Sequence, residues 1–279
     1  MSPRRRLRGS AGRLGLEPAA FLAQLRVMLA VQLQYRAVLL IWLLFFVLKP
    51  VIFLSVWSTI ARSSGGQVGG RAPADLAAYF LVTMWIIHLT FVYLLEVEGR
   101  VRRGEYSRLL LRPAHPIYDD LAANLAFKAL TVPVLAAATV VLVLLFRPRL
   151  EPPLWAIAAF VPSLGLAFVL RFVNGWALSL VAFWLTRLQA VVQAYLFVLS
   201  YLAGELAPLD LLPGWAQTAA WLSPFGWMLA FPAELLLGRL SPTQALIGLA
   251  AQLLWALLSL ALLPRCWRAA VRRYGAVGG

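Results

Sequence analysis

Acidic residues, cysteine and histidine are all scarce in this chain. It contains 11 acidic residues against 25 basic ones, two histidines and one cysteine among 279 residues. The lone Cys266 excludes an intramolecular disulfide framework. His88 and His115 lie far apart in the sequence, so the chain offers no cluster of Cys and His at metal-ligand spacing. We therefore expect no metal site.

Catalytic and nucleotide-binding motifs are also missing. The sequence has no GxxxxGK[ST] phosphate loop and no HExxH motif. The glycines of SSGGQVGG (residues 63–70) lack the strand-to-helix context that a phosphate cradle needs, and a flexible loop explains them. We expect a chain without catalytic residues and without a cofactor of its own.

Apolar residues are abundant: 62% of the chain is hydrophobic and 13% is charged, whereas a soluble protein carries about a quarter charged residues. Six apolar runs are long enough to cross a bilayer: residues 37–60, 76–95, 121–146, 154–186, 188–203 and 245–263. They predict an all-α polytopic membrane protein with six transmembrane helices. The fourth run would be roughly 50 Å long as one helix. It either tilts as a single helix or breaks at Arg171, Asn174 and Gly175 and adds a crossing.

The arginines predict the orientation, because Lys and Arg gather on the cytoplasmic side of membrane proteins. Seventeen arginines lie in the N-terminal stretch, after the second and fourth runs, and in the C-terminal tail, and five lie in the other connections. This asymmetry predicts that both termini are cytoplasmic and favours six crossings over seven. The apolar runs and the basic ends together predict three parts of the chain: an arm and interfacial helix (1–36), a six-span domain (37–264) and a tail (265–279).

The interfacial helix is predicted by spacing. Apolar residues recur every three or four positions between residues 17 and 36, as in a helix lying along the inner leaflet. They are Phe21, Leu22, Leu25, Met28, Leu29 and Leu33. The alternative is a simple extension of the first span.

A basic, proline-punctuated segment (97–120) separates the second and third runs. After Gly99, arginines alternate with apolar residues, which predicts a short helix lying against a polar partner or a lipid surface, ended by Pro113 and Pro116. The alternative is an ordinary connection whose charges only set the topology. Asp119 and Asp120 are adjacent acids without a catalytic partner cluster, and a helix N-cap role suits them better.

The stretch 205–242 is rich in Leu, Trp and Phe but is interrupted by prolines and glycines. Broken apolar helix at membrane depth is tolerated only inside protein or along a cavity, so we expect a re-entrant hairpin on the outer side. Four polar residues within spans are candidates for a substrate path or a subunit interface: Lys49, His88, Arg171 and Asn174. Arg171 could pair with Glu96 or line an inward cavity. The alternative roles are snorkelling and packing.

These features resemble the membrane permeases of type-2 ABC exporters, within a largely uncharacterised bacterial subgroup. The resemblance covers residues 36–263. It rests on the interfacial helix before six spans, EGRVRRGEYSRLLLRPAHP (98–116), AFW (182–184), GELAPLDLLPGW (204–215), SPF (223–225) and FPAELLLG (231–238).

The resemblance implies a permease of the bacterial inner membrane that pairs with a second six-span permease, identical or different, over two separate ATPase chains that bind ATP and Mg²⁺. It further implies that residues 99–113 form a coupling element in a cleft of the ATPase, and that the hairpin after the fifth span closes the outer exit. The coupling residues would be Gly99, Arg100, Arg102, Arg103, Glu105, Arg108, Leu109, Leu110, Leu111, Arg112 and Pro113. The outer gate would involve Glu205, Pro208, Leu209, Pro213 and Trp215.

Two other classes of membrane protein remain open. A secondary transporter would show internal repeats and acidic residues at midspan, and a membrane-embedded lipid-modifying enzyme would show clustered Asp, His or Glu near a headgroup plane. Neither pattern is found. Genes for an ATPase and a second permease beside this one would favour the exporter, whose substrate we expect to be amphipathic or lipid-like.

Overall fold

The computed structural model describes residues 18–274, and every regular element in that range is a helix. Five helices are long and apolar enough to cross a membrane, which confirms the all-helical class and makes this a multi-pass membrane protein. They are α3 (Arg36–Ser63), α4 (Pro73–Thr90), α7 (Ile117–Phe146), α8 (Leu154–Ser179), continued by the 3-10 turn η2 (Leu180–Phe183), and α13 (Pro242–Arg273).

The expected sixth crossing corresponds to a shorter helix. The apolar helix α9 (Gln189–Leu202) has 14 residues, about 21 Å of helix against a hydrocarbon core of about 30 Å. A sixth crossing therefore stays a prediction. After α9 the chain forms only short pieces, in line with the broken helix expected of 205–242. These pieces are η3 (Leu209–Leu211), α10 (Gly214–Leu222), α11 (Phe225–Met228) and α12 (Ala230–Leu236).

The fourth apolar run is one helix. Arg171, Asn174 and Gly175 lie inside α8, so the break considered for that position is absent. The second run, in contrast, ends early: α4 stops at Thr90, and its predicted extension to residue 95 is wrong.

The backbone beyond α4 is held by the neighbouring span α7. The carbonyl oxygen of Phe91 accepts hydrogen bonds from Asn124 Nδ2 at 2.7 Å and from Lys128 Nζ at 3.0 Å. Unwound backbone among transmembrane helices persists only where its polar groups find partners within the protein. The position of Lys128 within a span is thus explained by its hydrogen bond to the unwound backbone at Phe91.

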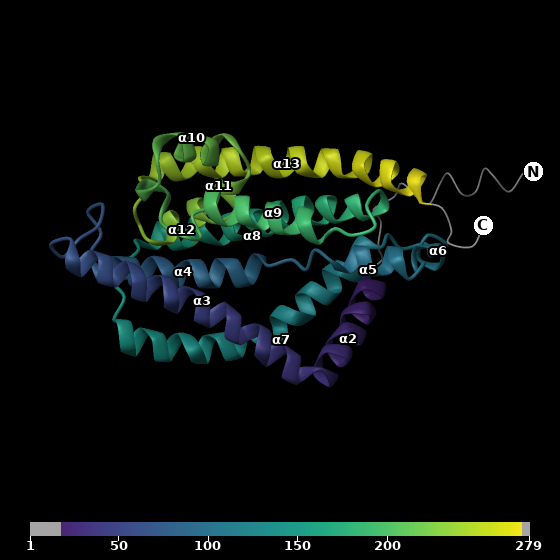
Figure 1. Ribbon diagram of the computed structural model, residues 1–279, viewed down its shortest axis with the longest axis horizontal. Coiled ribbons are helices and arrows are strands. Elements are labelled where there is room, and N and C mark those ends of the chain that lie inside the picture. Colours follow the sequence, from purple (N-terminus) through teal and green to yellow (C-terminus); the bar gives the residue numbers. More distant parts are fainter. Residues whose placement is uncertain (1–17, 275–279) are drawn as a thin grey trace, which may run out of the picture.

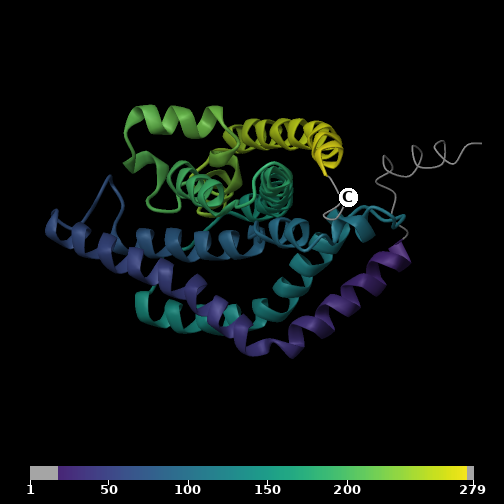
Figure 2. The same cartoon turned by 45° about the vertical axis from the view of Figure 1, so that its right-hand side comes forward.

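The chain begins its described part with α2 (Pro18–Gln34), which forms a V with α3 (Figure 1). Gln32 Nε2 donates a hydrogen bond to the carbonyl oxygen of Ala123 in α7 at 2.7 Å. The side chains of Leu22, Val27 and Leu33 are exposed. A helix is therefore present where the interfacial helix was expected, with apolar surface available to lipid, and its position at the inner leaflet stays a prediction. Span α7 contains Pro133 and changes direction along its length (Figure 2), as a proline inside a helix explains.

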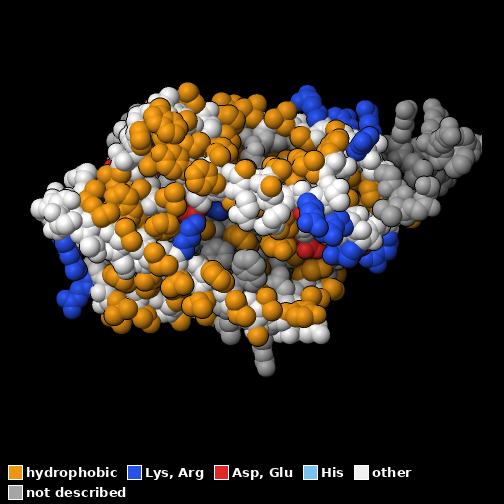
Figure 3. Space-filling model, in the orientation of Figure 1, with side chains coloured by type: hydrophobic (Ala, Val, Ile, Leu, Met, Phe, Trp, Pro, Cys, Tyr) orange, Lys and Arg blue, Asp and Glu red, His pale blue; other side chains and the backbone are white. Residues whose placement is uncertain are grey.

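The molecule has two different ends. At one end, α5 (Glu96–Arg102) and α6 (Tyr106–Leu109) lie near the beginning of α2 and the end of α13, and at the other lie the loop after α3 and the short helices α10 to α12 (Figure 1). Lys and Arg side chains gather over the α5, α6 and α13 end (Figure 3). One basic end is what the asymmetry of the arginines predicts for a chain oriented by the positive-inside rule.

This orientation can be tested through the chain's single cysteine. Cys266 is exposed near the basic end of α13. We expect a membrane-impermeant maleimide to label it in spheroplasts only after permeabilisation. A Cys266→Ser, Ser64→Cys variant, which moves the thiol to the exposed loop at the other end, should be labelled without permeabilisation. The opposite labelling pattern would contradict a cytoplasmic C-terminal end.

Candidate functional site

The coupling element expected at residues 99–113 lies at the basic end, within a basic segment (residues 96–113) that contains two helices. The expected single helix after Gly99 is wrong: α5 already begins at Glu96, ends at Arg102, and is separated from α6 by a turn. At the centre of this turn Gly104 has φ of +68°. In this left-handed conformation a side chain would cost about 1 kcal/mol or more, so Gly104 explains why the chain turns here.

The inward side of α5 is held by Arg100. Its Nη1 lies 2.8 Å from Asp120 Oδ1 and its Nε lies 3.2 Å from Glu96 Oε1. Asp120 also accepts a hydrogen bond from Trp176 Nε1 at 2.8 Å. Burial alone would lower the pKa of Arg100, but Asp120 and Glu96 outweigh it and raise the pKa above its ordinary value. Arg100 therefore ties the segment to α7 directly, and to α8 through Asp120, as a charged guanidinium.

The two acids at the start of α7 hold the segment rather than cap a helix. The N-cap of α7 is Pro116, so the N-cap role expected of Asp119 and Asp120 is wrong. Asp119 Oδ2 accepts a hydrogen bond from Arg112 Nη1 at 2.9 Å, and Asp120 pairs with Arg100 as described above. Both carboxylates lie in the first turn of α7, where the helix dipole favours negative charge.

The second half of the segment is anchored by aromatic packing. Tyr106 is fully buried, with its ring centroid 4.9 Å from that of Phe183 and 6.2 Å from that of Trp267. The hydroxyl of Tyr274, which follows α13, accepts from the Ser107 amide at 3.1 Å and lies 2.9 Å from Ser107 Oγ. The same hydroxyl donates to the carbonyl oxygen of Gly104 at 3.2 Å. The end of α13 thereby fixes the turn and α6.

A further contact joins the segment to α9. Glu98 Oε2 accepts a hydrogen bond from the backbone amide of Leu188, the residue just before α9, at 3.0 Å. The segment is therefore linked by side-chain contacts to α7, α8, α9 and the end of α13, so a displacement of α5 and α6 must move or break contacts with all four.

The outward side of the segment carries exposed charges, among them Arg102, which lies 3.6 Å from Glu98. The side chains of Arg102 and Arg103 are 59% and 58% exposed, and Leu111 is 80% exposed. Arg108, Arg112 and Pro113 are also exposed. Glu105 pairs with Arg103 at 2.5 Å. The expected coupling residues thus divide. Arg100 and Leu109 face the protein, Gly99, Glu105 and Leu110 are half-buried, and the others are exposed.

The connection to α7 contains a histidine in an aromatic environment. His115 lies with its ring centroid 4.5 Å from that of Trp267 and 5.6 Å from that of Trp176, and its Nδ1 accepts from the Ile117 amide at 3.3 Å. Burial lowers the pKa of His115 to about 4. The folded protein therefore holds the neutral ring.

This environment predicts a pH dependence. In the unfolded chain the ring has a pKa of about 6.5 and takes up its proton first, so the stability from neutral His115 is present above that pH and is lost as the pH falls toward 4. Because the ring keeps some access to solvent, we expect a loss of about 1 kcal/mol at pH near 5. Thermal unfolding of wild type and His115→Gln should then differ less at acidic than at neutral pH. An unchanged difference would contradict the neutral ring.

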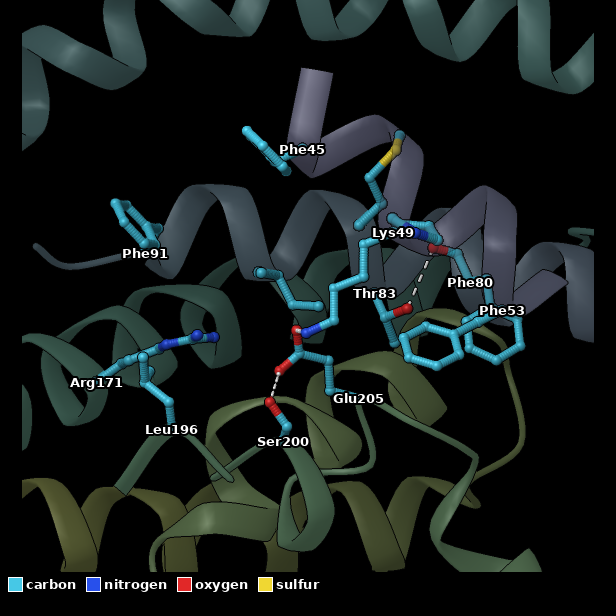
Figure 4. A pocket seen from close by; sticks show the side chains of 13 residues that line it. Phe45, Lys49, Phe53, Phe80, Thr83, Phe91, Arg171, Leu196, Ser200 and Glu205 are labelled. Atoms are coloured by element: carbon cyan, nitrogen blue, oxygen red, sulfur yellow. Dashed lines mark hydrogen bonds and ion pairs between the residues drawn. The ribbon is translucent and has the colours of Figure 1, made fainter. Parts of the chain in front are cut away.

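A cavity of about 260 Å³ lies among α3, α4, α8 and the end of α9. Lys49 Nζ in α3 lies 2.5 Å from Glu205 Oε1, and Ser200 Oγ donates to Glu205 Oε2 at 2.7 Å (Figure 4). Arg171 of α8 lines the same cavity. The structure therefore brings together Lys49, expected on a substrate path, and Glu205, expected at an outer gate.

The other two polar candidates do not line this cavity. His88 Nε2 lies 2.9 Å from Thr131 Oγ1, between α4 and α7. Asn174 Nδ2 donates to Ser259 Oγ at 2.9 Å, between α8 and α13. Both contacts join neighbouring helices.

Of the alternatives considered for Arg171, pairing with Glu96 is not observed, whereas lining a cavity is. Glu96 pairs with Arg100, and Arg171 Nη1 donates to Thr90 Oγ1 at 3.3 Å, where α4 ends.

A second cavity, of about 440 Å³, lies toward the basic segment. Its walls include Glu96, Arg100 and Asp120 of the ion-pair network, apolar residues of α2 and α3, and Phe91. Phe91 also lines the first cavity. The unwound stretch after α4 therefore separates two cavities and contributes a side chain to both.

The opposite end holds an ion cluster that sequence reasoning missed. Arg71, expected only as an outer-side charge, is 3% exposed, and its Nη2 lies 2.8 Å from Asp210 Oδ2 and 2.9 Å from Glu234 Oε1. Burial alone would lower the pKa of Arg71, but Glu234 and Asp210 outweigh it and raise the pKa. A possible signal was that Asp210 and Glu234 are, with Glu205, the acids of the 205–242 region.

The expected outer-gate residues lie in different surroundings. Pro208 and Leu209 are buried, whereas Pro213 and Trp215 are exposed, Trp215 by 67%. Glu205 is 8% exposed in the first cavity. These five residues therefore do not form one surface.

Comparison with known proteins gives one match. A family model described as ABC-2 family transporter protein matches residues 46–278. No curated protein and no solved structure matches the chain. The matched range includes α4 to α13 and most of α3. With them it includes the polar residues of the first cavity, those of the second cavity except Gln32, and the whole basic segment.

Proposed function

The chain belongs to the ABC-2 transporter family, and from that premise we propose that it is the permease of an ATP-driven exporter of amphipathic or lipid-like substrates in the bacterial inner membrane. Family membership makes it the membrane permease of an ABC transporter, in a family that is generally non-catalytic and works with an ATPase subunit and a membrane partner. The direction of transport, the substrate and the stoichiometry are proposals.

The observation that carries the proposal is the two-sided segment of α5 and α6. Its outward side presents Arg102, Arg103 and Arg108, and its inward side is tied to four helices through Arg100, Glu98 and the Tyr274 hydroxyl. Such a segment suits a coupling element, because a displacement of its exposed side by a bound partner would also displace the transmembrane helices that contact its inward side. We propose that it binds a cleft of an ATPase chain.

The proposed complex contains two ATPase chains, which bind ATP and Mg²⁺, and a second six-span permease, identical or different. Closure of the ATPase dimer would displace the coupling segments and rock the permeases between inward-open and outward-open states. The 205–242 hairpin would re-enter the membrane and close the outer exit. Within it, Arg71 would hold the hairpin in place through Asp210 and Glu234.

The two cavities support an amphipathic substrate. Both are lined mainly by apolar side chains with a few charges, and both share Phe91. We propose that a substrate enters from the inner leaflet through the larger cavity and passes Phe91 to reach the smaller one. Phe91 lies at the unwound end of α4, where a side chain can turn without breaking a helix.

The test is co-expression of the tagged chain with neighbouring ATPase and permease genes, followed by purification in detergent. We expect an ATPase to co-purify, and inside-out vesicles containing the complex to take up a fluorescent amphiphile only with ATP. A stable permease that retains no ATPase under any condition would overturn the proposal. ATP-dependent uptake into right-side-out vesicles loaded with ATP would instead reverse the direction.

A further inference from the structure

Arg171 is a buried charge without a counterion in contact. Its side chain is 7% exposed inside α8, and within residues 18–274 it forms no ion pair; its hydrogen bond is to Thr90 Oγ1 at 3.3 Å. A guanidinium has five N–H donors. Burying a charged group without a counterion is costly, so a buried arginine beside a cavity indicates a missing anionic acceptor.

The one carboxylate of the cavity is already occupied. Glu205 accepts from Lys49 Nζ at 2.5 Å with one oxygen and from Ser200 Oγ at 2.7 Å with the other. Figure 4 shows Arg171 and Lys49 reaching toward the same space from opposite sides. The cavity therefore holds two cationic side chains and one carboxylate, and an excess of positive charge remains on the Arg171 side.

Apart from Thr83, the rest of the cavity wall is apolar. Aromatic and aliphatic side chains from α3, α4 and α9 surround the charged groups: Phe45, Phe53, Phe80, Met84, Ile87 and Leu196. Phe45 is 62% exposed, so the cavity is open along α3. A volume of about 260 Å³ lies just below the range of about 300 to 1,000 Å³ of small-molecule pockets. It suits a small headgroup with the first part of an alkyl chain.

We propose that this cavity binds the anionic headgroup of a single-charge amphiphile, with Arg171 as its receptor and the alkyl chain leaving along Phe45 and α3. A guanidinium binds carboxylate or phosphate through two parallel N–H donors, which gives both charge neutralisation and orientation. The inference rests on the proposed function where it concerns cargo. The same chemistry is offered by an anionic lipid of the bilayer.

The test uses the purified chain in phosphatidylcholine nanodiscs without an ATPase. The probes are dansylaminoundecanoate and its uncharged amide, detected by energy transfer from tryptophan and corrected with empty nanodiscs. We expect the acid to bind about tenfold or more tightly than the amide, because charge-assisted hydrogen bonds favour the anion. Arg171→Gln should abolish this preference, Arg171→Lys should restore part of it, and the exposed control Arg187→Gln should leave it unchanged.

Other outcomes are decisive in the same assay. Equal binding of acid and amide to wild type overturns the proposal, whether or not any variant folds. The proposal is also overturned if the Arg171→Gln protein unfolds at a lower temperature but keeps the preference for the acid. Arg171 would then be a packing residue.

A further arm separates the two sources of the ligand. Phosphatidylglycerol added to the nanodiscs should displace the probe if a bilayer lipid is the natural occupant, and should leave probe binding unchanged if the occupant is a free amphiphile. Because no ATPase is present, failure of the exporter proposal leaves this binding result intact, and failure of binding leaves ATPase co-purification intact.

Discussion

Reversal of three outward arginines, Arg102, Arg103 and Arg108 to glutamate, is expected to abolish co-purification of the ATPase and ATP-dependent transport. Each side chain is exposed on the coupling segment, and none belongs to the ion pairs of Arg100 or to the Tyr274 contacts. Arg102 has a surface ion pair with Glu98 at 3.6 Å, which its reversal also removes. Charge reversal replaces attraction by repulsion at an interface, and three reversals together should weaken binding by a factor of at least about one hundred. The measurement is the ratio of ATPase to permease after affinity purification.

A matched control uses the opposite end of the molecule. Arg62, Arg147 and Arg149 are exposed there, so their reversal changes the net charge equally but leaves the coupling segment intact. The control should retain the ATPase. Cys266 labelling in the reversed variant checks that the topology is unchanged. If the coupling variant keeps its ATPase with correct topology, or the control loses it equally, α5 and α6 are not the docking surface.

Replacement of Arg71 by methionine is expected to destabilise the folded protein by about 3 kcal/mol. Methionine retains much of the volume but removes the cation that contacts both Asp210 and Glu234, and it leaves Glu234, 17% exposed, with Arg239 at 3.9 Å as its basic neighbour. Removal of one partner from a buried ion pair costs about 3–5 kcal/mol, and the half-exposed Asp210 places this case at the lower limit. The measurement is the midpoint of thermal unfolding in detergent.

Two comparisons give this prediction its control. Arg62→Met, at the same end but exposed, should change stability by less than about 0.5 kcal/mol. Arg71→Met combined with Glu234→Gln should be less destabilising than the sum of the single changes, because the two residues share one interaction. An Arg71→Met protein as stable as wild type would show that the ion cluster does not hold the hairpin.

The elements of this fold are largely predictable because a bilayer leaves few choices. Long apolar runs must satisfy their backbone groups internally, and helices do so, so residues 37–60, 121–146, 154–186 and 245–263 appear as membrane-length helices. Prolines remove backbone donors and end helices, so the broken character of 205–242 was also predictable. Pro213 and Pro224 lie directly before α10 and α11.

Contacts between distant positions were not predictable from pattern. The end of α4 at Thr90 depends on Asn124 and Lys128, more than thirty positions later, which supply donors to the Phe91 carbonyl. The arginines of the basic segment cannot be told apart in the sequence, yet Arg100 faces inward because Asp120 lies at the start of α7. A helix-period pattern shows which residues share a face, and it does not show what that face meets.

The sequence by itself determined that this protein is helical, spans a membrane, has one basic end and carries the motifs of its family, because hydropathy, charge and proline act locally along the chain. Only the tertiary structure decided which charges meet. Lys49 joins Glu205 across 156 positions, Arg71 joins Asp210 and Glu234, and Arg171 remains beside a cavity without a carboxylate in contact. The physical reason is that a buried charge is stabilised by whatever lies within a few ångströms, and packing brings those partners together from positions far apart in the sequence.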